Sequence, residues 1–208
     1  MTGSRRERMA DGDAPGAALR KLVAEAVGVE RIGVEEVGVE EFDAETSDAE
    51  TSDSEAIAAG LAERGEDPGP AARLPELVAS GDSVVGVVPR ADTALARRVL
   101  GNGDGDGEGR GVAREEGRTV RLVFTGRAAD RLAGPSGAVI RSVLAEHGVD
   151  AHRHDGDSPI GVLLVGDRAV VGLFDDRGLA ALLWSDAPAV REWAAATCRR
   201  YLAAAEPA

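Results

Sequence analysis

Short apolar runs recur along the second half of the chain, and each is ended by glycine, proline or charged residues. Runs of about four to eight residues rich in valine, isoleucine and leucine are typical of β-strands. The runs predict strands at residues 83–88, 119–125, 149–152, 160–165, 169–174 and 179–184. Sequences such as GVLLV do not alternate with polar residues, which favours strands buried on both faces of a sheet.

Apolar positions at helical spacing predict helices between and around these strands. They fall at residues 17–27, 92–100, 128–132, 138–147 and 187–204. Asp92 would cap the second helix, and Pro188 stands in the first turn of the last, where proline is tolerated. The order of elements from residue 83 predicts an α/β fold, a mixed β-sheet flanked by helices.

The first 70 residues have a different character. The pentapeptide AETSD occurs twice in tandem within residues 44–55, and residues 35–67 hold 13 acidic residues against one basic residue, Arg64. Such sequence buries too little apolar surface to fold. Residues 32–39 suggest a weak strand, and residues 66–70 (EDPGP) indicate a linker. We therefore expect residues 1–70 to be an acidic, largely disordered segment with one short helix (17–27), and residues 71–206 to form the α/β domain.

Charge changes the picture only in this segment. The formal net charge is −13, yet the 175 residues outside residues 35–67 carry 24 acidic and 23 basic residues. A chain of this charge lacks the basic patch that nucleic-acid binding needs. The acidic tract favours a salt-adapted (halophilic) organism. No apolar run reaches the length of a membrane-spanning helix, and the polar N-terminus does not read as a secretory signal, so we expect a cytoplasmic protein without membrane contact.

Four features could carry chemistry, and each also has a plain structural interpretation. His152 and His154 could contribute to a zinc site, although zinc needs three or four converging ligands and two histidines near a turn need no metal. Residues 104–115 nearly fit a calcium-binding loop, but a strand follows where a helix belongs. Residues 134–137 open a helix and could hold an anion, or form a simple turn.

The fourth feature is nucleophilic side chains. Ser136, Ser158 and Ser185 lack the glycine-rich turn and the partner base that an activated serine requires. Cys198 is the only cysteine, which excludes an intrachain disulfide, and its place in a predicted helix favours a passive, buried thiol. We therefore assign no catalytic residue, no metal site and no cofactor.

Residues 157–205 carry the most distinctive pattern. A Ser-Pro pair precedes three apolar strands separated by two Asp-containing turns, and a Ser-Asp pair leads to a final helix with Trp-Ala and Arg-Tyr pairs. The segment resembles the effector-sensing domain of archaeal winged-helix transcriptional regulators, of the methanogenesis-regulatory (Fil) type, which are related to the TrmB regulators. The matching positions are Ser158, Pro159, Gly161, Asp167, Arg168, Asp175, Gly178, Ser185, Asp186, Trp193, Ala194, Arg200 and Tyr201.

The resemblance implies a phospholipase-D-like sensor domain without the catalytic motif. A His-x-Lys motif is absent because Lys21 is the only lysine, so we expect no enzyme activity. The implied function is effector sensing in an archaeal transcriptional regulator, with a small metabolite as ligand and a homodimer or partner regulator as assembly. Residues 1–70 hold no recognisable winged helix, which argues against direct DNA contact. Candidate ligand contacts are Arg127, Asp167, Arg168, Asp175, Asp176 and Trp193.

Two other functions stay open from the sequence. The chain could be a non-catalytic protein–protein interaction module, with the acidic N-terminal segment as its docking tail. A phospholipase-D-type or metal-dependent hydrolase is the weakest hypothesis, because its chemistry would depend on His152 and His154 in the absence of the His-x-Lys motif.

Overall fold

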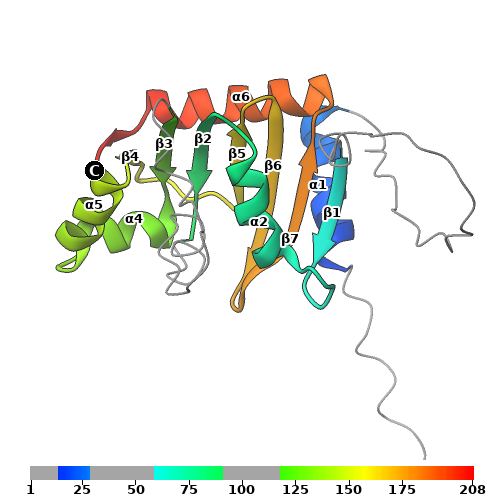
Figure 1. Ribbon diagram of the computed structural model, residues 1–208, viewed down its shortest axis with the longest axis horizontal. Coiled ribbons are helices and arrows are strands. Elements are labelled where there is room, and N and C mark those ends of the chain that lie inside the picture. The colour runs from blue at the N-terminus through cyan, green and yellow to red at the C-terminus, as the bar shows by residue number, and fades with distance from the viewer. Residues whose placement is uncertain (1–13, 29–58, 91–117) are drawn as a thin grey trace, which may run out of the picture.

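The computed structural model describes residues 14–28, 59–90 and 118–208, and Figure 1 shows how their elements are arranged. The helices are α1 (Pro15–Val27), α2 (Pro70–Ala79), α4 (Gly126–Ala133), α5 (Gly137–Glu146) and α6 (Pro188–Ala203). The strands are β1 (Ala59–Glu63), β2 (Ser83–Val88), β3 (Thr119–Phe124), β4 (Val149–Arg153), β5 (Ile160–Val165), β6 (Arg168–Asp175), β7 (Gly178–Ser185) and β8 (Glu206–Pro207).

All eight described strands belong to one mixed sheet, in the order β1-β7-β6-β5-β2-β3-β4-β8. β2, β3 and β4 are parallel to one another, whereas β1, β7, β6, β5 and β2 form antiparallel pairs. β2 and β6 therefore point the same way, and their carboxyl ends lie at the same edge of the sheet as those of β3 and β4.

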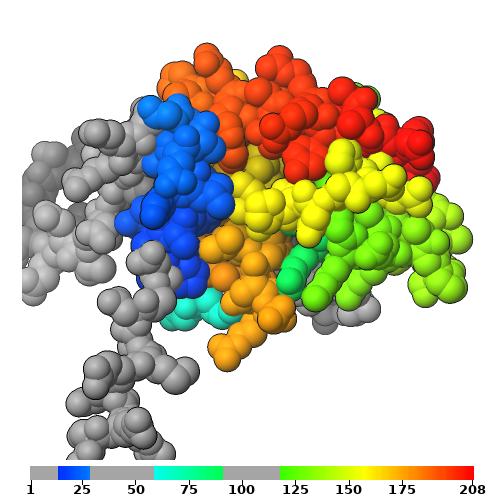
Figure 2. Space-filling view, turned by 180° about the vertical axis from the view of Figure 1, so that it is seen from behind, coloured from blue at the N-terminus to red at the C-terminus, as the bar shows by residue number. Residues whose placement is uncertain are grey.

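Helices cover both faces of the sheet, so its strands are buried on both sides. α2, α4 and α5 lie on the face that Figure 1 presents, and Leu77, Leu132 and Leu144 anchor them in one apolar cluster. α1 and α6 lie on the opposite face, seen in Figure 2, and Leu19 and Val190 belong to the second cluster there. The non-alternating strands predicted from runs such as GVLLV are explained by these two helical layers.

The predicted mixed α/β sheet is confirmed, and so are the predicted strands and helices that fall within the described residues. β2 and β5 have the bounds that the apolar runs predicted. The helix predicted at residues 17–27 begins two residues earlier, at Pro15. The likeness to the phospholipase D fold stays a prediction.

α1 and β1 both lie within the first 70 residues, which the sequence assigned to an acidic segment with one short helix. β1 pairs with β7 along its whole length, and α1 buries Leu19 and Val23 completely. Residues 66–70 form the short connection from β1 to α2, which begins at Pro70. Hydrophobic pattern did not reveal β1 or α2, because β1 (AGLAE) has one large apolar side chain and α2 contains Pro75, which normally signals a helix end.

Some predictions fall outside the described residues. These are the weak strand at 32–39, the AETSD repeats, the helix at 92–100 and the calcium-like loop at 104–115. Among the residues that are described, no helix has both the length and the apolar composition needed to cross a membrane.

Candidate functional site

Three glycines interrupt three neighbouring strands on the face that α2 covers. Gly86 lies on β2, Gly161 on β5 and Gly172 on β6, and Gly161 and Gly172 are paired in register. A glycine inside a strand leaves a gap in the row of side chains and often marks close approach by another group. Leu163 fills the gap above Gly86, where its Cδ2 lies 2.2 Å from an ideal Cβ position. The gap over Gly161 and Gly172 is filled only in part.

A β-bulge shapes the wall beside these glycines. Leu173 pairs with Ala181 and Phe174 with Leu179, so Ala180 is the extra residue on β7. Because of the extra residue, Leu179 and Leu182 both point to the α2 face, three positions apart. β-Bulges re-aim side chains in this way and are frequent beside functional sites.

A cavity of about 70 Å³ remains between these strands and α2. Its walls come from α2, from the carboxyl ends of β2 and β6, and from the start of β5 and β7. All but one of the described lining residues are apolar or glycine: Leu74, Val87, Val88, Pro89, Gly161, Leu163, Val170, Gly172, Phe174, Leu179 and Leu182, with Arg90 as the exception. A void this size exceeds the ~10–15 Å³ that one water needs, but an apolar lining gives water few hydrogen-bond partners.

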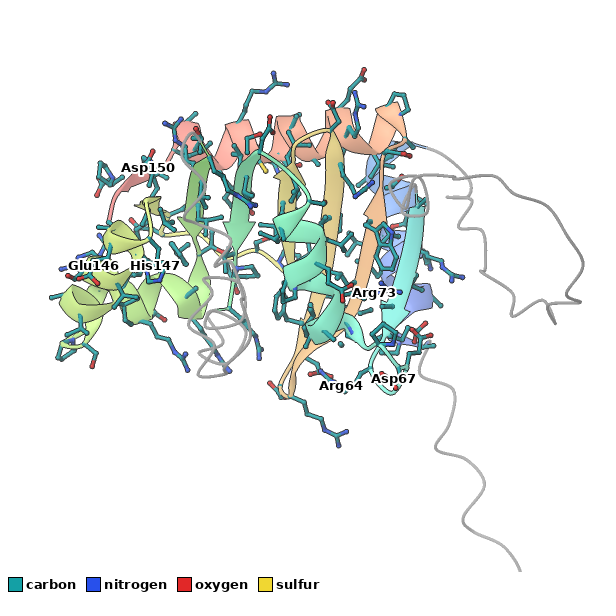
Figure 3. All side chains as sticks on the ribbon, in the orientation of Figure 1. Arg64, Asp67, Arg73, Glu146, His147 and Asp150 are labelled. Atoms are coloured by element: carbon teal, nitrogen blue, oxygen red, sulfur yellow. The ribbon has the colours of Figure 1, made fainter. Side chains whose placement is uncertain are left out.

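Two arginines hold the β6–β7 turn, which joins the cavity-lining residues Phe174 and Leu179. Arg90 Nη1 donates to the backbone oxygen of Asp175 at 2.6 Å, and its Nη2 lies 3.6 Å from Oδ1 of Asp176. Arg64, directly after β1, donates to both carboxylate oxygens of Asp175, at 2.6 and 2.9 Å. Figure 3 shows Arg64 at the end of the sheet where the β6–β7 turn lies.

The two aspartates of this turn differ in their electrostatics. The hydrogen bonds from Arg64, with a smaller contribution from the backbone N–H of Arg177, hold the pKa of Asp175 at about 2, below its ordinary value of 3.8. Asp175 and Arg64 therefore neutralise each other. The side chain of Asp176 is 94% exposed, and its ion pair with Arg90 is long, at 3.6 Å. Arg90 is the less completely neutralised of the two arginines.

The sequence-predicted ligand residues do not gather at one place. Asp175 and Asp176 lie at the turn just described, and Arg127 is exposed in the first turn of α4, at the same edge of the sheet. Asp167 and Arg168 lie at the β5–β6 turn, at the other end of β6 and about 23 Å away for an eight-residue strand. There Asp167 lies 3.9 Å from Nη1 of Arg191.

Trp193 lies on α6, on the face of the sheet opposite the cavity. It is partly buried against the cluster that contains Val190 and Ala194. Tyr201 packs against the same cluster. A ligand contact by Trp193 stays a prediction.

The histidine cluster predicted as a possible metal site is divided among separate partners. His152 Nε2 lies 3.0 Å from Oδ1 of Asp150, and His154 Nδ1 accepts from the backbone N–H of Gly156 at 2.8 Å. His147, directly after α5, has its Nδ1 2.8 Å from the backbone oxygen of Val143, and Figure 3 shows this residue at the opposite side of the molecule from Arg64. Within residues 14–28, 59–90 and 118–208, no three His, Cys, Asp or Glu side chains are grouped as a metal site requires.

The remaining chemical candidates have structural partners. Ser158 Oγ donates to the backbone oxygen of Ile160, and Ser185 Oγ accepts from the N–H of Ala187. In the turn at residues 134–137, Gly137 donates its N–H to Gly134. Cys198 is 2% exposed, which confirms its predicted burial, and burial raises the pKa of the thiol to about 11.

Comparison with known families identifies the C-terminal part of the chain. Residues 110–204 match the family model for methanogenesis regulatory protein FilR1, middle domain. The resemblance predicted from residues 157–205 is thereby confirmed. This FilR1-type segment contributes β5, β6 and β7 to the cavity, whereas β2, Arg90 and α2 precede it in the chain. The family is named for regulation and not for catalysis. No curated protein matches the chain.

Among solved structures, the fold is similar to that of TrmBL2, described as an archaeal chromatin protein with a novel mode of DNA binding. The TM-score is 0.51 at 10% sequence identity, and the match covers 76% of this chain and 57% of that chain. At this identity the similarity concerns the fold alone. The chain thus spans less than two thirds of the TrmBL2 chain.

Sequence reasoning missed the residues that make the cavity, although a signal was present. Gly86, Gly161 and Gly172 each interrupt a predicted apolar strand (SVVGVV, IGVLLV and AVVGLF). Glycine within a strand marks a bulge or a close approach, so three of them on adjacent strands indicate a hollow. Arg90 follows the first of these strands and Arg64 follows β1, and neither carries a sequence signal of its role.

Proposed function

We propose that this chain is the effector-sensing part of an archaeal transcriptional regulator, and that the cavity between α2 and the sheet is the effector site. The match of residues 110–204 to a regulator domain supports the first half. The second half depends on one observation, an apolar cavity floored by Gly161 and Gly172, with Phe174 and Leu179 from either side of the β6–β7 turn in its wall. Ligand sites are typically concave and mostly apolar, with a few polar groups that orient the ligand.

The contacts of the β6–β7 turn also connect the site to other parts of the fold. The β6–β7 turn joins two residues of the cavity wall, Phe174 and Leu179, and it is held by Arg64, which follows β1, and by Arg90, which follows β2. A ligand that moves this turn would change contacts of the edge strand β1. Binding can shift a conformational equilibrium only through such differential contacts.

Thermal unfolding of the full chain in molar KCl, with metabolites of different charge, tests the proposal. A ligand at a hundredfold excess over its dissociation constant stabilises the fold by about 2.7 kcal/mol, or about 5–11 °C in Tm for a protein of this size. Gly161→Ala places a methyl group 3.0 Å from Cε2 of Phe174 and should remove the shift.

Gly134→Ala is the matched control, because its added methyl group makes only ordinary contacts, the nearest at 3.4 Å from the backbone oxygen of Asp130. This variant should keep the ligand-induced shift. If no compound of any charge stabilises the wild-type chain, the proposal is wrong and the interaction module with an acidic docking tail becomes the better account. A shift that survives in Gly161→Ala would place the ligand elsewhere.

A further inference from the structure

Arg90 is the charged member of an otherwise apolar lining among the described residues. Its side chain is 30% exposed, so it reaches from the cavity wall to solvent. Arg64 makes a two-pronged ion pair with Asp175, with both N–O distances under 3 Å. Arg90 instead donates to a neutral backbone oxygen and has the more distant, highly exposed Asp176 as its carboxylate partner.

The guanidinium of Arg90 can therefore form a stronger ion pair than the one it makes with Asp176. Charge-assisted hydrogen bonds to a carboxylate are about twice as strong as neutral ones, and arginine accepts a carboxylate in a planar, two-pronged geometry. Asp176 at 3.6 Å does not provide that geometry. A carboxylate at the mouth of the cavity would compete with Asp176 for Arg90 while the rest of the ligand enters the apolar space.

The volume limits the apolar part. An engineered protein cavity of about 150 Å³ binds benzene, which has six carbon atoms. By proportion, a cavity of about 70 Å³ accommodates roughly three carbon atoms, the size of an isopropyl group. A sugar or polyol would bury hydroxyl groups against leucine, valine and glycine without hydrogen bonds, which is unfavourable.

We propose that the cavity binds a short, branched monocarboxylate whose carboxylate pairs with Arg90 in place of Asp176 and whose alkyl end lies over Gly161 and Gly172. This inference rests on the proposed effector site and names the chemical class of its ligand. Exchange of Asp176 for the ligand would also release one of the contacts that hold the β6–β7 turn.

Three probes with the same branched alkyl chain and head groups of different charge test the class. These are 3-methylbutanoate, 3-methylbutanamide and 3-methylbutylamine, titrated into the full chain by calorimetry or NMR. We expect the carboxylate to bind about tenfold or more tightly than the amide, because a two-pronged ion pair between two charged groups is stronger than hydrogen bonds from Arg90 to a neutral amide. The amine should bind most weakly, because its cation would face Arg90. In Arg90→Gln the carboxylate and the amide should bind with about equal affinity.

Arg90→Gln would also weaken binding if it simply displaced the turn. A second variant is therefore chosen that should strengthen carboxylate binding. Asp176→Asn removes the competing carboxylate and leaves Arg90 in place, and it should tighten 3-methylbutanoate binding several-fold without changing amide binding. Because Asp176 is 94% exposed, the variant should fold normally. The Asp167–Arg191 pair, 3.9 Å apart at the other end of β6, supplies charge-matched controls. Asp167→Asn and Arg191→Gln should leave all three affinities unchanged.

The outcomes separate this inference from the proposed function. If the amide binds as tightly as the carboxylate and Gly161→Ala abolishes both, the effector site stands and the carboxylate assignment is wrong. Equal or weaker carboxylate binding in Asp176→Asn would also overturn the exchange. If no probe binds while an unrelated metabolite stabilises the wild-type chain and not Gly161→Ala, the ligand class is wrong and the site remains. If Gly161→Ala changes nothing for any ligand, the site itself is wrong.

Discussion

Helix α1, the one helix that the sequence predicted within the acidic first 70 residues, packs on the sheet, and one pair of substitutions measures its contribution to the fold. Val23 on α1 is 0% exposed, and Val139 on α5 is 67% exposed. Val→Ala at both positions makes the same chemical change within a helix. Any gain from the better helix propensity of alanine is therefore common to both variants, and the difference between them reports burial.

Val23→Ala removes two methyl groups from a closed apolar cluster. Their transfer costs about 1.6 kcal/mol at ~0.8 kcal/mol per group, and the cavity left behind adds roughly 1 kcal/mol. We expect the free energy of unfolding to fall by about 2–3 kcal/mol, which corresponds to about 4–12 °C in Tm for a protein of this size. Val139→Ala should change it by no more than about 0.5 kcal/mol.

Urea unfolding followed by tryptophan fluorescence measures both variants. Trp184 and Trp193 report from opposite faces of the sheet, so a coincident transition would also show that both clusters unfold together. Equal stability of the two variants would refute the packing of α1 on the sheet, because the buried methyl groups would then contribute nothing.

Three further outcomes follow from single contacts. In Arg64→Gln, the pKa of Asp175 should rise from about 2 towards its ordinary 3.8, as measured by carboxyl NMR titration. In the wild-type protein this pair stabilises the fold above the unfolded-state pKa, and that contribution is lost as the pH falls through about 2; the variant should lack this acid dependence. The Cys198 thiol, with its pKa raised to about 11, should react with iodoacetamide at pH 8 much more slowly in the folded protein than in urea, and equal rates would contradict its burial. Gly60→Val should lower Tm and alter tryptophan fluorescence, because an ideal Cβ at this position lies 2.3 Å from Cζ2 of Trp184; an unchanged Tm would contradict that contact.

The parts of the fold that the sequence predicted are those in which local pattern and tertiary packing agree. β5 (IGVLLV) and β2 (SVVGVV) are apolar on both sides because helices cover both faces, and their composition already indicates this. β1 and α2 are held in place by tertiary contacts instead. Five residues of β1 complete the ladder of β7, and α2 tolerates Pro75 because packing of Leu74, Leu77 and Val78 stabilises the helix.

The candidate site was less predictable than the fold, for a physical reason. Charged turn residues such as Asp167 and Asp175 look equivalent in the sequence, but the strand between them places them at opposite edges of the sheet. The cavity depends on cross-strand register, which pairs Gly161 with Gly172, and on the bulge at Ala180. Neither register nor bulge position is visible in a single strand pattern. Arg90 reaches the β6–β7 turn because β2 and β6 end at the same end of the sheet.

The most direct test of the effector site is a titration of the full chain with 3-methylbutanoate, followed by NMR of labelled leucine and valine methyl groups. We expect the shifts to be confined to methyl groups that line the cavity: Leu74, Val88, Leu163, Val170, Leu179 and Leu182. Leu19, Val23 and Val190, in the cluster across the sheet, should stay unchanged. Shifts at Leu19 and Val190 without shifts around Gly161 and Gly172 would contradict the site.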